Sequence, residues 1–331
     1  MKKLFALLLA GGLIAATAVP LSAYLKLGAR IGDRTVTLQW ERFPVRYFVT
    51  DQGTAGVSSQ QFQAAIQSAF ATWEAIEGAD IRSEFVGFTQ APPRLGDDMN
   101  VLGFVNRPEQ DRVLGSTSFL IDTADGRIVE SDIFFNSLFS WSVAPGGQAG
   151  SFDLESIAVH EIGHMLGLGH SAIGETEVRP GGRRVIAAEA VMFPIAFSPG
   201  NIQLRTLKAD DVAGMVDIYG TTAARRRTGS VSGRVTKSGA GVFGAHVVAF
   251  NPRTGALIGG FTLNANGNFT IAGLEPGPHV IRVEPLDDAE IESFLDATNV
   301  DIDFRVKFYE RLVVVPRGGG TRGVDLAVVP K

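Results

Sequence analysis

The chain of 331 residues contains no cysteine, and this absence excludes several kinds of covalent bond and functional site. Disulfide bonds, thiolate zinc fingers, cysteine nucleophiles and lipid attachment through a leader cysteine are all excluded. Histidine is also scarce, with five residues, so their positions are informative. The net charge of -5 offers no basic surface for nucleic acid, and we expect no nucleic-acid partner.

Long apolar runs are missing as well, except at the start of the chain. Two lysines precede an apolar run over residues 4–19, which is the layout of an export signal. The run is shorter than the ~20 apolar residues of a membrane span. We therefore predict a signal peptide over 1–23, cleaved after Ala18 or Ala23, with an uncleaved anchor as the alternative. The mature protein is expected to be exported, either secreted to the extracellular space or periplasmic, without a stable membrane span.

The chain as a whole has an ordinary globular composition, 45% hydrophobic and 20% charged. At ~150 residues per domain it should form about two domains. Hydrophobic periodicity predicts an α+β fold over 24–220, with a mixed twisted sheet and three helices that begin near Ser58, Asp153 and Lys208. Residues 221–230 look like a solvated linker. Short β-rich runs separated by turns predict a small all-β sandwich over 231–331.

Three of the five histidines lie within eleven residues, in the run His160-Glu161-Ile162-Gly163-His164-Met165-Leu166-Gly167-Leu168-Gly169-His170. Four helical residues advance by about 400°, so His160 and His164 lie one turn apart on one face and can reach the same metal ion. Gly167 can end the helix and Gly169 can free the next bend, which brings His170 round as a third ligand. Three neutral nitrogens fit zinc and leave its fourth position open for water.

Glu161 flanks the two helical histidines. Its carboxylate can accept a proton from zinc-bound water while zinc polarises a carbonyl oxygen, and can then deliver that proton to a departing amine. Glu161 is therefore predicted to be the catalytic general base. A purely structural zinc is the alternative, but it would favour four protein ligands, and no cysteine exists to complete such a set.

These residues resemble the metzincin metalloproteases, and most closely their matrixin branch. Supporting features are Ser171 after the third histidine, the run Ala190-Val191-Met192-Phe193-Pro194 and the segment 207–220. The resemblance covers about Trp40 to Gly220. It implies a hydrolase of the matrix-metalloprotease type, in which Met192 forms an apolar floor, or Met-turn, beneath the metal.

The resemblance also implies an edge strand that pairs with an extended substrate, here at Leu114, Gly115 and Ser116. After residue 230 the sequence is similar to the carboxypeptidase-regulatory-like, transthyretin-like sandwich. Phe134 stands where matrix metalloproteases have a histidine for a second, structural zinc, so one catalytic zinc is predicted. The resemblance allows bound calcium, but no motif in the sequence identifies its ligands. The candidates are loop acids, for which solvation is the simpler interpretation: Asp97, Asp98, Asp122 and Asp125.

Two departures from the family pattern concern regulation and specificity. Without cysteine, no pro-segment thiol can block the zinc, so any latency must work differently. The stretch from His170 to Met192 is longer than usual and should reshape the pocket for the side chain that follows the scissile bond.

The predicted function is a secreted, monomeric zinc endopeptidase that acts on protein or peptide substrates, including those of an extracellular matrix. One alternative is an exported binding or adhesion protein with a vestigial metalloprotease domain. Another is a zinc hydrolase that acts on esters or glycans.

Overall fold

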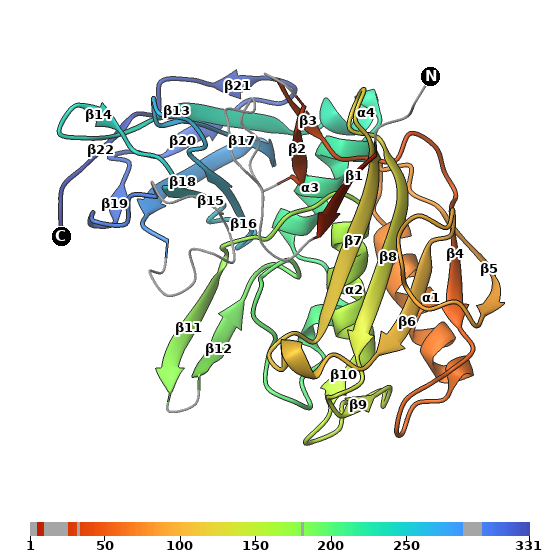
Figure 1. Ribbon diagram of the computed structural model, residues 1–331. Coiled ribbons are helices and arrows are strands. Elements are labelled where there is room, and N and C mark those ends of the chain that lie inside the picture. Colours follow the sequence, from red (N-terminus) through yellow and green to blue (C-terminus); the bar gives the residue numbers. More distant parts are fainter. Residues whose placement is uncertain (1–4, 10–25, 32–33, 180–181, 287–299) are drawn as a thin grey trace.

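The computed structural model describes residues 5–9, 26–31, 34–179, 182–286 and 300–331, and Figure 1 shows their arrangement. A sheet with helices forms one half of the molecule, and two β-sheets form the other. Most of the predicted leader lies outside the described residues, although Phe5–Leu9 form strand β1. Among the helices that are described, none has both the length and the apolar character that a membrane crossing requires.

Six strands form the central sheet, in the order β1-β7-β8-β6-β4-β5. The strands β8, β6, β4 and β5 run parallel, whereas β7 is antiparallel to both β8 and β1. In β4, the side chains of Val45, Tyr47 and Val49 alternate into the core as a half-buried strand requires. The strand bounds are β1 Phe5–Leu9, β4 Val45–Thr50, β5 Ser83–Thr89, β6 Val101–Val105, β7 Gly115–Asp122 and β8 Ile128–Asn136.

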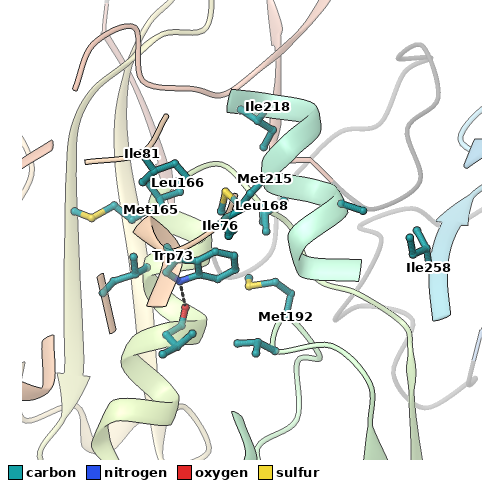
Figure 2. Close-up of a cluster of buried hydrophobic side chains, with 14 of the residues drawn as sticks. Trp73, Ile76, Ile81, Met165, Leu166, Leu168, Met192, Met215, Ile218 and Ile258 are labelled. Atoms are coloured by element: carbon teal, nitrogen blue, oxygen red, sulfur yellow. Dashed lines mark hydrogen bonds between the residues drawn. The ribbon is translucent and has the colours of Figure 1, made fainter. Parts of the chain in front are cut away.

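Two helices, α1 (Ser59–Glu74) and α2 (Leu154–Met165), pack together beside this sheet. A capping box between Ser58 and Gln61 begins α1, whose apolar face is fully buried and ends in Trp73. The Trp73 indole Nε1–H donates to the Val159 carbonyl of α2 at 2.9 Å, as Figure 2 shows. Because this bond is buried, it fixes α1 against the helix that carries the histidine pair.

The other elements of the first half are short. Helix α3 (Ala209–Tyr219) is followed by α4 (Thr222–Arg225), and two 3₁₀ turns cover Pro108–Gln110 and Gln203–Arg205. Three pairs of strands complete it: β2 Gly28–Ile31 with β3 Arg34–Thr37, β9 Trp141–Ser142 with β10 Phe152–Asp153, and β11 Gly174–Arg179 with β12 Gly182–Ala188.

The second half is a sandwich of two sheets. One is built on β13, with β14, β17, β21 and β22, and the other contains β16, β15, β18, β19 and β20. Their bounds are β13 Gly229–Lys237, β14 Ala240–Gly241, β15 His246–Phe250, β16 Leu257–Phe261, β17 Asn268–Leu274, β18 Gly277–Glu284, β19 Lys307–Phe308, β20 Val313–Val315, β21 Gly320–Thr321 and β22 Leu326–Val328.

The predicted α+β class and the C-terminal sandwich are confirmed. The stretch 221–230 has more structure than a solvated linker, because it contains α4 and the first two residues of β13. Thr221 caps α4 by accepting the N–H of Ala224, and the Arg225 guanidinium donates to the Val216 and Ile218 carbonyls of α3. These bonds hold the stretch against the first half of the molecule.

Candidate metal centre

Helix α2 places His160 and His164 on one face, and a glycine turn then redirects the chain. Gly167 has φ of +99°, and Leu168 N–H and Gly167 N–H donate to the carbonyls of Gly163 and His164 at 3.0 and 2.7 Å. This pair of bonds is a Schellman motif, which ends the helix with a left-handed residue. An added Cβ at Gly167 would lie 2.4 Å from the Leu38 carbonyl oxygen, so only glycine fits.

The turn brings His170 back to the histidine pair, so that one ring nitrogen from each of the three side chains lies within 4.8 Å of the others. Nδ1 of His160 is 2.8 Å from the Val191 carbonyl, and Nδ1 of His164 is 2.7 Å from the Leu168 carbonyl. A carbonyl can only accept, so each Nδ1 carries the hydrogen. Burial lowers the pKa of both rings and favours their neutral form, in which each Nε2 presents a lone pair.

The donor set therefore fits Zn²⁺. Nε2 of His164 lies only 3.1 Å from Nε2 of His170, a separation at which two facing lone pairs repel unless a proton or a cation lies between them. Zinc takes imidazole nitrogens at ~2.0–2.1 Å in tetrahedral geometry. The backbone carbonyls that hold Nδ1–H are the outer partners that usually orient such ligands.

Glu161 is buried, with 5% of its surface exposed, and lies against strand β7. The Thr117 hydroxyl donates to its Oε2 at 2.7 Å. Gly115, two residues away on the same face of β7, makes room for the carboxylate, since an added Cβ would lie 3.0 Å from Oε1. Burial raises the pKa of Glu161 to about 7, and the Thr117 hydrogen bond opposes this rise. A carboxyl group with such a pKa can both accept and return a proton near neutral pH.

Met192, the residue predicted to form the Met-turn, packs against helix α2 at Gly163. Its side chain is 2% exposed, and an added Cβ at Gly163 of α2 would lie 2.4 Å from Met192 Sδ. Figure 2 shows Met192 beside Trp73 in the same apolar cluster. Asp211 of α3 holds this turn from the other side, accepting the N–H groups of Val191 and Met192 at 2.9 and 3.2 Å.

The long stretch between His170 and Met192 is a projecting hairpin with a closed base (Figure 1). Its strands are β11 and β12. Ser171 N–H donates to the Met192 carbonyl at 2.9 Å, and Glu189 N–H donates to the Ile173 carbonyl at 3.0 Å. The two ends of the insertion are thus pinned together where they leave the centre.

Strand β7 contains two of the three residues predicted to pair with substrate, Gly115 and Ser116. Strand β1 pairs with β7 from Ser118 to Asp122, so this part of β7 has a neighbour on each side. The register of β1 stops before Leu114, Gly115 and Ser116, the three residues predicted to pair with substrate. Of these three, Gly115 lies close to Glu161, since a Cβ added at Gly115 would be 3.0 Å from Oε1.

Three of the four acidic loop residues named as calcium candidates accept hydrogen bonds from the protein. Asp122 pairs with Arg127 at 2.7 Å, Asp125 accepts the Arg127 N–H at 3.0 Å and Asp97 accepts the Met99 N–H at 3.1 Å. Nearby, the buried Glu130 carboxylate accepts the N–H groups of Gly96 and Asp98.

Asp132, also beside this loop, is 3% exposed, and its Oδ2 has no hydrogen-bond partner among the described residues. Burial is the main cause that raises its pKa to about 7. The N–H of Val101 opposes the rise, and the charges of Glu130 and Asp97 add to it.

Sequence reasoning named the histidines, Glu161 and Met192 but missed their supports. Thr117 lies 44 residues from Glu161, and Asp211 lies 19 and 20 residues from the turn that it holds. Neither shares a local motif with its partner. Asp210 and Asp211 begin α3 and are both buried, which a local sequence pattern does not show.

The sequence model of the matrixin family matches residues 39–220 of the chain, and that of the carboxypeptidase regulatory-like domain matches residues 230–305. Similar curated proteins include Metalloendoproteinase 1-MMP of Arabidopsis thaliana, 28% identical over 55% of this chain and 44% of its own length. Metalloendoproteinase 5-MMP of the same plant is 39% identical over 27% and 20%, and Stromelysin-1 of Mus musculus is 28% identical over 56% and 34%. The chain thus spans less than half the length of each of these relatives.

Proposed function

Because the chain belongs to the matrixin family, we propose that it is a zinc-dependent endopeptidase that hydrolyses peptide bonds within proteins or peptides. The observation that carries this proposal is the convergence of His160, His164 and His170 beside one buried carboxylate, that of Glu161. These three histidines are the proposed zinc ligands. When bound there, zinc polarises the scissile carbonyl and lowers the pKa of a water molecule.

Glu161 is the proposed general base and acid. With its pKa raised to about 7 by burial, the carboxylate takes a proton from the attacking water onto one oxygen and returns it to the departing amine. Thr117 holds Oε2, which leaves Oε1 to face the reacting groups. An extended substrate is proposed to pair along Leu114, Gly115 and Ser116, which brings its scissile bond close to this carboxylate.

The domain organisation proposed with this function has four parts. They are an export signal over 1–23, a catalytic domain over 24–220, a connection over 221–230 and a sandwich over 231–331. The lysines and apolar run at the start of the sequence support export. Mass spectrometry of protein recovered from the medium should show a new N-terminus after Ala18 or Ala23, and an intact Met1 in membranes would contradict export.

The activity is tested with purified protein and casein, with and without a chelator. We expect internal cleavage that stops when zinc is removed and returns when zinc is added back. Glu161→Gln keeps the size of the side chain and the three ligands, so it should bind zinc normally and lose cleavage. Intact casein with the wild-type protein would favour the binding-protein alternative, and unchanged cleavage by the variant would refute the role of Glu161.

A further inference from the structure

The sandwich contacts the first half of the molecule at helix α3. Gly259 of β16 donates its backbone N–H to Asp210 Oδ1 at 2.9 Å. One turn along α3, Ala213 lies against Gly273 of β17, where an added Cβ would come within 2.7 Å of Ala213 Cβ. Asp210 and Ala213 are 2% and 5% exposed, so both residues are buried at this contact. Figure 2 shows Ile258 of β16 facing the same helix.

Asp210 also holds the segment that carries the third histidine. Its second oxygen, Oδ2, accepts the Ser171 hydroxyl at 2.6 Å, and Ser171 follows His170 directly. The N–H of Ser171 donates to Met192 of the Met-turn. A continuous series of bonds therefore runs from the backbone of the sandwich, through one buried carboxylate, to the residue beside His170.

His170 depends on such support more than the other two histidines do. His160 and His164 are fixed by the backbone of α2, whereas His170 comes after the helix has ended at Gly167. A buried carboxylate that loses one of its donors is destabilised and will shift towards water or another partner. Docking of the sandwich thus favours the position of Asp210 in which it holds Ser171.

We propose that the sandwich is a positioning element of the metal centre: through Gly259 and Asp210 it holds Ser171, and thereby His170, in place for zinc. This inference rests on the proposed zinc site. It gives the second domain a role in metal retention, separate from any contact with substrate.

The test uses the full-length protein and two matched glycine variants. Gly273→Ala places a methyl group against Ala213 and separates the sandwich from α3. Gly255→Ala is the control, because its φ of +80° is close to the +74° of Gly273 but its Cβ would meet nothing within 4 Å. Both variants carry the same backbone strain, and only the first disturbs the contact.

The readouts are the rate of zinc loss to a chromogenic chelator and hydrogen exchange at the Gly259 amide. We expect Gly273→Ala to release zinc roughly tenfold faster, the change produced by loss of a hydrogen bond to a charged group. Its Gly259 amide should also exchange faster, while Gly255→Ala stays close to wild type. Equal rates of zinc release in the two variants would overturn the proposal.

A double-mutant cycle tests the route through Ser171. Ser171→Ala should itself speed zinc release, and in that background Gly273→Ala should add little, because both changes break the same series of bonds. Fully additive effects would reject the route. A wild-type protein that binds one zinc and cleaves casein, with additive variants, would leave the proposed function intact and reject this inference alone. A wild type that binds no zinc would reject the zinc site itself.

Discussion

Replacing Thr117 by valine should remove the hydrogen bond that supports Glu161, the proposed general base, without changing the proposed zinc ligands. Valine has nearly the shape of threonine but lacks the hydroxyl that donates to Glu161 Oε2 at 2.7 Å. A buried hydrogen bond to a charged group contributes about 1.5–3 kcal/mol, and each ~1.4 kcal/mol corresponds to a factor of ten in rate. We therefore expect kcat to fall by roughly 10- to 150-fold.

The pH profile of kcat should shift to higher pH in the Thr117→Val variant. The Thr117 hydrogen bond favours the ionised carboxylate and so lowers the pKa of Glu161, against the rise caused by burial. Without the hydroxyl that pKa rises further, and the acidic limb of kcat should shift to higher pH. KM should change little, since Thr117 is fully buried.

The assay is steady-state cleavage of a quenched peptide across pH, with zinc content measured on the same samples. Thr117→Ser keeps the hydroxyl and should restore most of the rate, which a general packing defect would not allow. If Thr117→Val keeps the wild-type kcat and pH profile while holding one zinc, the positioning argument is refuted.

Three further results are expected. Because the pKa of Asp132 is about 7 in the folded protein and 3.8 as a free side chain, the free energy of unfolding should fall by up to about 4 kcal/mol as pH rises from about 4 to 7. Urea titrations of Asp132→Asn should show a fall smaller by this amount, because the other buried acids keep their contributions, and parallel pH curves for the two proteins would contradict the prediction. Gly163→Ala, whose Cβ would lie 2.4 Å from Met192 Sδ and 2.9 Å from the Trp73 ring, should lower stability by about 1–3 kcal/mol, whereas Gly146→Ala, with open space around it, should not. Removal of zinc should lower Tm, since a ligand at 100 times its Kd adds about 2.7 kcal/mol; a melting curve unaffected by chelator would argue against a bound metal.

The parts of the site that could be predicted are those specified by local spacing. A helical period places His160 and His164 together, and a glycine at the right distance ends the helix. The apolar face of α1 could also be predicted from the sequence, because Phe62, Ile66 and Trp73 recur at helical intervals. In each case the residues that act together are close in sequence.

What escaped prediction depends on contacts between distant segments. Nothing near Thr117 marks it as the partner of Glu161, and nothing near Gly259 marks it as a donor to Asp210. Strand β5 was missed because its burial alternates weakly, and it owes its place to parallel pairing with β4. Strands β11 and β12 lie in the stretch that was noted only for its length, because their charged residues hide the period of a strand.

The hydrogen-bonded base of the β11–β12 hairpin has a consequence for how the sequence of this protein can vary. A backbone hydrogen bond joins Ser171 to Met192 across the two ends of the insertion. The positions of these two residues therefore do not depend on the length of the hairpin between them. The entropy of closing a loop grows only slowly with its length. Related sequences can therefore change the length or the residues of the hairpin while the three histidines and Glu161 keep their arrangement.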